Sequence, residues 1–286
     1  MQKTVLITGA ASGIGRATAA AFQQAGFITY ATARKKSDLA GLQASGCHAL
    51  RLDVTEEDSM QKAVRTIEQA HGSLDVLVNN AGYGQMGPLE EVPLDALHRQ
   101  FETNVFGLVR LTQLVLPGMR NRRQGRIINI SSMGGEFTTP LGGAYHATKY
   151  AVESLSDALR FEVRPFGVEV VVIQPGPIRT RLGEDTLAQL RGTPGSPYAE
   201  MVEGLAEMSR KSFSTGNGMG TPEQVARVIL SAAQARHPKT RYRITAMAHL
   251  MPRLRRFLPD STWDAMWRRM LKISTPSPAT RSTEDA

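Results

Sequence analysis

The sequence has little cysteine, few aromatic residues and no long apolar run. Cys47 is the only cysteine in 286 residues, so no disulfide can form within the chain, which fits a reducing compartment. No apolar run approaches the ~20 residues that a membrane-spanning helix requires. The run before the first glycines, Thr4–Ile7, is also too short for the core of a signal peptide. We therefore expect a globular protein of the cytoplasm.

Acidic residues are scarce near the C-terminus, where the positive charge gathers. Arg236 to Ala286 contain 11 Lys/Arg and four Asp/Glu, which account for most of the net charge of +8. The rest of the chain is nearly neutral and has no basic stripe with base-stacking groups. We therefore expect no nucleic-acid partner.

Short apolar runs alternate with helical patterns, which predicts a parallel sheet covered by helices on both faces. Val168–Ile173 is apolar at all but one position, as is typical of a strand buried on both faces. The predicted strands are Val5–Ile7, Phe27–Thr32, Ala49–Val54, Leu74–Val78, Arg126–Ile130, Val168–Ile173 and Lys239–Thr245. The expected fold class is α/β, a doubly wound seven-stranded parallel sheet in a single domain.

Helix start and stop signals separate these strands. Thr55 followed by Asp58 is similar to a capping box, and Thr221 with Pro222 marks the start of a later helix. The predicted helices are Ala17–Ala25 ended by Gly26, one from about Thr55 to Ala70, a long one opened by Pro93, Gly143–Phe166, and one capped by Thr221.

A glycine-rich turn, Thr8–Gly15, follows the first strand with the spacing G-x-x-x-G-x-G. Glycine permits positive φ and close backbone approach, and the free N–H groups of the next helix attract a pyrophosphate, so the turn predicts nucleotide binding. The second strand ends in Arg34, Lys35 and Lys36, where an NAD site usually has an acid. Arg34 favours a 2′-phosphate, and therefore NADP(H), with NAD(H) as the alternative. A solvated charge run is the competing interpretation.

Tyr145 and Lys149 are four residues apart in the Gly143–Phe166 helix and therefore share one face. A free phenol has a pKa of about 10. A nearby ammonium group is expected to lower that pKa, as proton transfer near neutrality requires. Such a pair, taken alone, is more often a surface contact.

Residues at the predicted strand ends support the catalytic interpretation, because ligands of such sheets bind beyond the carboxyl ends of the strands. These residues are Gly13, Asp53, Asn80, Ser132 and Pro175.

Together the motifs resemble one family, the short-chain dehydrogenases/reductases, in their compact Rossmann-fold form. Thr8–Gly15 matches the family's TGxxxGIG, Asn79–Gly82 its NNAG, and Pro175 begins its PGxIxT segment. The match covers about residues 3 to 235. The catalytic tetrad of the family corresponds to Asn104, Ser132, Tyr145 and Lys149.

The resemblance implies an oxidoreductase that interconverts a ketone or aldehyde and an alcohol by hydride transfer. Ser132 would hold the carbonyl oxygen, and Tyr145 would act as general acid or base, so both would touch the small-molecule substrate. Lys149 would bind the nicotinamide ribose and lower the phenol pKa, and Asn104 would hold a water that links Lys149 to solvent. No metal is expected.

The resemblance also implies the cofactor contacts, with Asp53 and Val54 at the adenine and with Ile178 and Thr180 at the carboxamide. The full set expected at NADP(H) is Gly9, Ser12, Gly13, Ile14, Gly15, Arg34, Asp53, Val54, Asn80, Ala81, Gly82, Tyr145, Lys149, Pro175, Gly176, Ile178 and Thr180.

Other features concern the substrate. His146 stands where a serine is frequent in the family, and we expect it to pack rather than to donate a proton. Ala31–Arg34 and the basic C-terminal segment look most like the branch with 17β-hydroxysteroid and retinol dehydrogenases, which implies a bulky apolar substrate. Candidate residues for lining its pocket are Met86, Phe137, Leu141, Met201 and Leu205.

The expected organisation is a domain over residues 1–247 with a flap at 182–220, a helical extension over 248–273 and a disordered tail over 274–286. The extension has an apolar stripe formed by Trp263, Met266, Trp267, Met270 and Leu271. We expect this stripe to pack on the body or on a second copy, in a dimer or tetramer. The alternatives are membrane contact through this basic helix, a nucleotide sensor without turnover, and a sugar epimerase or dehydratase.

Overall fold

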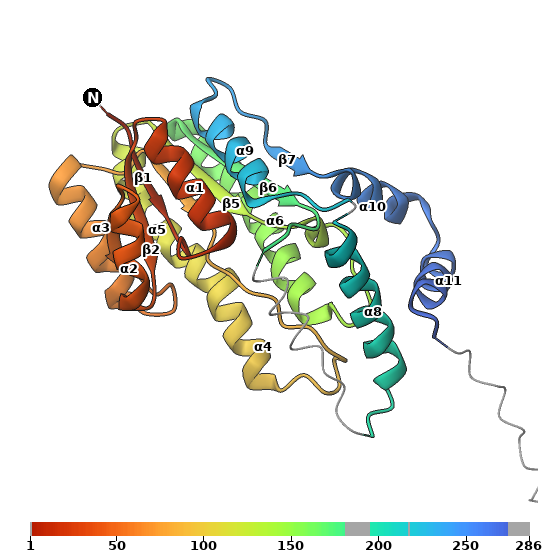
Figure 1. Cartoon of the computed structure of the whole chain (residues 1–286). Coiled ribbons are helices and arrows are strands. Elements are labelled where there is room, and N and C mark those ends of the chain that lie inside the picture. The colour runs from red at the N-terminus through yellow and green to blue at the C-terminus, as the bar shows by residue number, and fades with distance from the viewer. Residues whose placement is uncertain (1, 181–194, 217, 274–286) are drawn as a thin grey trace, which may run out of the picture.

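The computed structural model describes residues 2–180, 195–216 and 218–273, which form one twisted parallel sheet with helices on both faces (Figure 1). The strand order is β3-β2-β1-β4-β5-β6-β7, and every neighbouring pair is parallel. The strands are β1 (Thr4–Ile7), β2 (Ile28–Ala33), β3 (His48–Arg51), β4 (Val76–Asn79), β5 (Gly125–Ile130), β6 (Val168–Pro175) and β7 (Arg241–Ile244). The predicted fold class is confirmed.

Two apolar layers bury the two faces of the sheet. One layer joins the sheet to α1, α2 and α9, and the other joins it to α3, α5 and α6. Val5 and Ile7 belong to the first layer and Leu6 to the second, since successive side chains of a strand point to opposite faces. The central strands β1, β4 and β6 are therefore nearly continuous apolar runs. The helices are α1 (Gly13–Gln24), α2 (Leu39–Ala44), α3 (Glu57–His71), α5 (Gly107–Asn121), α6 (Gly143–Val163) and α9 (Pro222–Gln234).

The third strand and the helix after it differ from the prediction. β3 ends at Arg51, because Asp53 forms a local turn. The Oδ1 atom of Asp53 accepts hydrogen bonds from the backbone N–H of Thr55 at 3.0 Å and from the Thr55 hydroxyl at 2.8 Å. The predicted capping box at Thr55 and Asp58 is therefore wrong, and α3 begins at Glu57 without a side-chain cap. The cap of α9 is as predicted, since Thr221 accepts from Gln224 N and Gln224 bonds back to Thr221 N.

The long helix predicted after Pro93 is interrupted. α4 (Leu94–Phe101) passes into a π-helical segment, η2 (Glu102–Phe106), before α5 continues. A π segment inside a helix widens one turn and often marks a functional position. Asn104 lies in this segment.

The C-terminal third adds α8 (Ala199–Thr215), α10 (Ala246–Phe257) and α11 (Asp260–Leu271), which gather at one end of the molecule (Figure 1). Their apolar side chains form a third cluster around Phe137, Trp263 and Trp267. Residues 182–194 and 217 of the predicted flap, and the predicted tail, lie outside the described residues. Across the described ranges, no helix has the length and apolar character needed to cross a bilayer.

Candidate active site

A cavity of about 450 Å³ opens at the carboxyl ends of the strands. It brings together five segments that are far apart in sequence: the turn after β1, the end of β4, the end of β5 with α6, the end of β6, and α8. Predicted residues that line it are Gly9, Ser12, Gly13, Ile14, Gly15, Asn80, Ala81, Gly82, Ser132, Tyr145, Lys149, Pro175, Gly176, Ile178 and Thr180. Arg34, Asp53, Val54 and Asn104 are not among the lining residues.

The glycine-rich turn is shaped to admit a ligand close to the backbone. Gly9 and Gly13 have φ values of 66° and 53°, in the left-handed region that favours glycine. A Cβ on Gly15 would lie 2.3 Å from the carbonyl oxygen of Gly9 and 2.5 Å from Asn80 Nδ2. Ser12, the N-cap of α1, makes no side-chain cap, and the first turn has no acid. The N–H groups at this helix start therefore remain available to an anion.

Thr8 ties the glycine turn to the end of β4. Its hydroxyl accepts from the backbone N–H groups of Asn80 and Ala81, both at 2.9 Å. Asn80 Nδ2 in turn donates to the carbonyl oxygens of Thr8 at 2.9 Å and of Gly9 at 3.2 Å. Thr8 was not among the predicted site residues, although it stands inside the matched TGxxxGIG run.

Ser132 and Tyr145 lie close together in the wall of the cavity, with their side chains hydrogen-bonded. Ser132 follows β5, and its Oγ accepts from Gly134 N at 3.1 Å, at the start of the short 3₁₀ segment η3 (Met133–Gly135). Burial raises the pKa of the Tyr145 phenol above its ordinary value, and a hydrogen bond with the Ser132 side chain lowers it. The two hydroxyls therefore bracket one position where a substrate oxygen would lie.

Lys149 lies one turn along α6 from Tyr145. Its Nζ is 5.7 Å from the centre of the Tyr145 ring and donates to the carbonyl oxygen of Ile130 at 2.9 Å. Burial lowers the pKa of Lys149 to about 8, and the carboxylate of Glu153 raises it. The pKa of Tyr145 is accordingly raised, not lowered as expected, because burial of the phenol has the largest effect on it.

Asn104 lies behind the cavity wall. Its Oδ1 accepts from Tyr83 N at 3.0 Å, and its Nδ2 donates to Tyr83 O at 2.9 Å and to the Thr148 hydroxyl at 3.1 Å. A Cβ placed on Gly82 would lie 3.0 Å from Asn104 Oδ1 and 4.0 Å from Lys149 Nζ. The amide oxygen and the ammonium group therefore both approach Gly82.

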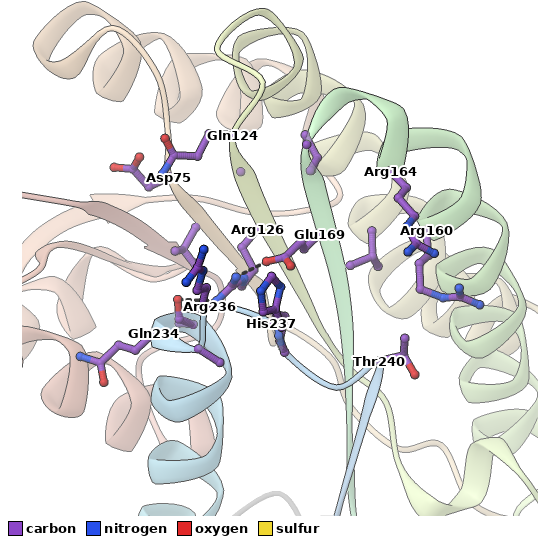
Figure 2. A pocket seen from close by; sticks show the side chains of 18 of the residues that line it. Asp75, Gln124, Arg126, Arg160, Arg164, Glu169, Gln234, Arg236, His237 and Thr240 are labelled. Atoms are coloured by element: carbon purple, nitrogen blue, oxygen red, sulfur yellow. Dashed lines mark hydrogen bonds and ion pairs between the residues drawn. The ribbon is translucent and has the colours of Figure 1, made fainter.

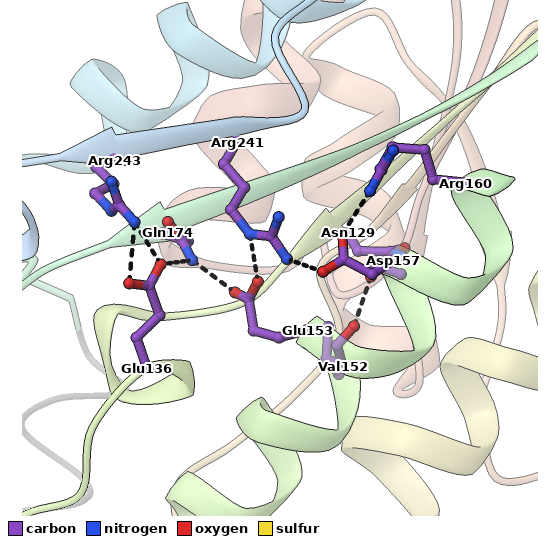
Figure 3. Close-up of polar contacts among 10 residues, drawn as sticks. Asn129, Glu136, Val152, Glu153, Asp157, Arg160, Gln174, Arg241 and Arg243 are labelled. Carbon is purple, nitrogen blue, oxygen red and sulfur yellow. Dashed lines mark hydrogen bonds and ion pairs between the residues drawn. The ribbon is translucent and has the colours of Figure 1, made fainter. Parts of the chain in front are cut away.

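Glu153 belongs to a buried polar network that the sequence analysis missed (Figure 3). Its carboxylate accepts from Gln174 Nε2 and from Arg241 Nε, both at 2.9 Å. Gln174 Nε2 also donates to Glu136 at 2.6 Å, and Glu136 pairs with Arg243. The spacing of four residues from Lys149 to Glu153 was a signal in the sequence, because it puts the two charges on one face of α6.

Three predicted cofactor residues lie outside the cavity lining. Arg34 directly follows β2 and is exposed, and it has no hydrogen bond or ion pair with any described residue. Asp53 holds the turn after β3, as described above. Val54 is buried in the core layer that includes α3 and α5, and a Cβ on Gly107 would lie 2.8 Å from Val54 Cβ.

His146 is buried and has a packing role. Its Nδ1 is 2.7 Å from the carbonyl oxygen of Phe137, and its ring fills the space beside Gly134 and Gly142. Hydrogen bonds with the backbone of Phe137 and Gly134 raise the pKa of His146, but burial has the larger effect and lowers it. The ring therefore fixes the loop after β5 and is neutral near pH 7.

Several apolar side chains line the cavity. Met86 and Leu205 line it as predicted, together with Met133 and Phe213, which the sequence analysis did not name. Phe137, Leu141 and Met201 are not among the lining residues, and they pack in or against the third apolar cluster, to which Leu205 also belongs. The spacing of residues along the helix and the loop could not distinguish lining from non-lining residues, because both kinds are apolar and lie near the same cavity.

A larger hollow, of about 850 Å³, lies at the opposite edge of the sheet (Figure 2). It contains no predicted site residue. Its most buried cation, Arg126, donates to the carbonyl oxygens of Ala232 and Ala233 and pairs with Glu169, so it secures the end of α9. The carboxyl-edge cavity is therefore the candidate active site.

Comparison with known proteins agrees with this geometry. The profile of the short chain dehydrogenase family matches residues 3–191, and it includes the glycine turn, Ser132, Tyr145 and Lys149. The chain belongs to this family. It is accordingly an NAD(P)-dependent oxidoreductase, as the sequence predicted.

Two of its relatives in this family are named as reductases. A 3-ketodihydrosphingosine reductase of Bacteroides thetaiotaomicron is 36% identical over 90% of this chain and 93% of the relative. An NADPH-dependent 3-dehydrocapnine reductase of Ornithobacterium rhinotracheale is 35% identical over 94% of this chain and 98% of the relative.

Solved structures in the family share the fold. A short-chain dehydrogenase from Streptomyces avermitilis has a TM-score of 0.78 and 33% identity, over 96% of this chain and 100% of that one. A member from Burkholderia phymatum in complex with NAD has a TM-score of 0.75 and 26% identity, over 89% and 93%. These similarities extend to nearly the whole chain in each case.

Proposed function

We propose that this dehydrogenase is an NADP(H)-dependent enzyme that reduces a bulky apolar ketone, or oxidises the corresponding alcohol, with Tyr145 as general acid or base. The observation that supports this most is the shared cavity of Ser132, Tyr145 and Lys149 beside the glycine turn. The turn fits a dinucleotide, because its left-handed glycines and open helix start leave space and donors for a pyrophosphate.

In reduction, the Ser132 hydroxyl donates a hydrogen bond to the carbonyl oxygen and holds it beside the Tyr145 hydroxyl. Tyr145 then gives its proton to that oxygen as negative charge develops there. The nicotinamide, when bound, supplies the hydride to the carbonyl carbon. The positive charge of Lys149 stabilises the phenolate that remains. Asn104, held by Tyr83 and Thr148, would position a water that returns the proton.

The preference for NADP(H) is supported by Arg34. The residue follows β2, where the ribose of an adenine nucleotide lies in this fold, and its exposed guanidinium forms no hydrogen bond or ion pair in the described part of the chain. A guanidinium matches the geometry of a phosphate and forms paired hydrogen bonds with it. The relative named as an NADPH-dependent reductase is consistent with this preference.

The size of the substrate is inferred from the apolar side chains in the cavity lining. Met86, Met133, Leu205 and Phe213 line the same cavity as Ser132 and Tyr145. A ketone with a long apolar arm would bury that arm against them, which favours binding in proportion to the area removed from water. The two named relatives, whose names carry a 3-keto and a 3-dehydro compound, are consistent with such a ketone.

The test is a panel of ketones scored by loss of absorbance at the reduced nicotinamide band. It runs from acetone to long-chain 3-keto compounds, including 3-ketodihydrosphingosine. We expect kcat/KM to rise with the length of the apolar arm and turnover with NADPH to exceed that with NADH. Higher kcat/KM for acetone-sized ketones would contradict the proposed substrate class, and no turnover of any carbonyl compound would contradict the reductase activity.

The Tyr145→Phe variant isolates the proton transfer. We expect kcat to fall by about 10²- to 10⁴-fold, the usual contribution of a general acid, while the Kd for NADPH stays near that of the wild type. Cofactor affinity is measured by quenching of protein fluorescence. Undiminished turnover in this variant would remove Tyr145 from the reaction.

A further inference from the structure

The outer face of α10 carries large apolar side chains together with cations. The exposed residues of this helix recur at helical spacing and are Ala246, His249, Leu250, Arg253, Arg256 and Phe257. Leu250 is 50% exposed and Phe257 is 79% exposed, so neither contributes to the apolar clusters of the body. This set defines the α10 outer face.

The charge on this face is of one sign. Helix α10 contains no acid, and neither Arg253 nor Arg256 forms a hydrogen bond or ion pair with the residues that the structure describes. Arg255 behaves differently, because its guanidinium bonds to Asp260 and lies over the Trp263 ring on the body side. The two outer arginines are therefore available to an external anion.

The orientation of α10 is fixed by its inner face. Ala248 and Met251 are buried, and Met251 belongs to the cluster that contains Phe137 and Trp263. Most of the apolar stripe predicted on α11 packs into the same cluster, since Trp263, Trp267 and Leu271 are buried there. Contact with a membrane through the α11 tryptophans is therefore excluded, whereas the α10 outer face remains free.

We propose that the α10 outer face docks on an anionic phospholipid bilayer. Phe257 and Leu250 would enter the interfacial region, and Arg253 and Arg256 would lie at the headgroup phosphates, as in other amphipathic helices that lie in the membrane plane. A second copy of the chain fits this face poorly. A two-fold contact would bring arginines together with no acid of α10 between them. This docking does not depend on the identity of the substrate.

The proposed surface lies close to the active site. α10 packs against η3, the segment that directly follows Ser132. A membrane contact through α10 would therefore hold the cavity near the bilayer surface, where an apolar substrate accumulates.

Vesicle flotation of the full chain tests the docking. The vesicles contain phosphatidylcholine alone or phosphatidylcholine with an equal part of phosphatidylglycerol. We expect flotation with the mixed vesicles only, and less of it as salt screens the charges. The Arg253→Gln/Arg256→Gln double variant should bind about 25-fold less, at roughly fivefold for each arginine near an anionic surface. Leu250→Ser/Phe257→Ser should also reduce binding, in low and in high salt.

A matched control removes the same charge elsewhere. Arg227 on α9 and Arg236 after it are exposed, and Arg227→Gln/Arg236→Gln should float like the wild type. Thermal melts confirm that all variants fold, as expected for exposed positions. The proposal is overturned if the wild type does not float, if the control loses binding equally, or if the α10 variants change the mass of the protein in solution, which would assign the face to a second copy.

Discussion

Arg34 is the single residue on which the proposed cofactor preference depends. We expect Arg34→Ala to weaken NADPH binding by roughly tenfold to a hundredfold, the range for a hydrogen bond to a charged group, and to leave NADH binding nearly unchanged. Lys36→Ala, two residues further on in the same basic run, is the matched control and should change neither affinity much. Titration of each variant with both cofactors measures this. An equal loss for NADPH and NADH would mean that Arg34 does not bind the 2′-phosphate.

The pH dependence of the reduction is set by Lys149 and its neighbour Glu153. The pKa of Lys149 is about 8, so its charge is present below that pH and is lost as the pH rises through it. We expect kcat/KM for reduction to fall on the alkaline side of this pKa, because the ammonium group no longer stabilises the phenolate. The pH profile of kcat/KM reports ionisations of the free enzyme.

Glu153→Gln tests this assignment. Its carboxylate raises the Lys149 pKa, so its removal should move the alkaline limb to lower pH. Arg241 keeps Asp157 as a partner in this variant. Glu136→Gln is the control, because Glu136 shares Gln174 with Glu153 but is not a cause of the Lys149 shift. If the alkaline limb of the kcat/KM profile stays at the same pH in Glu153→Gln, that limb does not report the ionisation of Lys149.

At the scale of the element, the glycine turn and α1 act as one unit. A Cβ on Gly15 would lie 2.3 Å from Gly9 O, so Gly15→Ala must displace the turn. We expect a loss of about 1–3 kcal/mol in the free energy of unfolding, together with weaker cofactor binding. Gly41→Ala in α2 is the contrasting variant: nothing lies within 4 Å of its Cβ position, and it should stabilise by about 0.5–1 kcal/mol. Thermal and urea melts measure both.

The helices and strands also show which features of the fold could be predicted from the sequence. The central strands β1, β4 and β6 were predictable because their apolar runs are buried on both faces. The glycine turn was predictable because its spacing is tied to a strand and a helix. The β3 end was misplaced because the Asp53 turn interrupts an apolar pattern that continues to Val54. The π segment around Asn104 leaves no mark in the periodicity, and the Glu153–Arg241 pair joins residues 88 positions apart.

At the scale of the whole molecule, α6 joins the active site to an exposed surface. Tyr145 and Lys149 lie on its inner side, whereas Tyr150, Leu155 and Phe161 are exposed, Phe161 by 66%. Phe106, at the end of η2, is 54% exposed, and η2 packs against α6. This surface differs from the α10 outer face, because its Arg160 lies over the Phe161 ring and pairs with Asp157. A nearly neutral apolar surface fits a second copy of the chain.

We therefore expect the protein to form a homo-oligomer through the outer side of α6. Light scattering of the purified chain should give a multiple of 31.2 kDa. The Leu155→Glu/Phe161→Glu variant should shift the mass to a single chain, because a two-fold contact would bury the new carboxylates against each other. Phe257→Ser on α10 should leave the oligomer intact. A monomeric wild type, or an oligomer that survives both α6 charges, would show that this surface has another use. If the variant loses turnover as well as the oligomer, the contact also stabilises the helix that holds Tyr145 and Lys149.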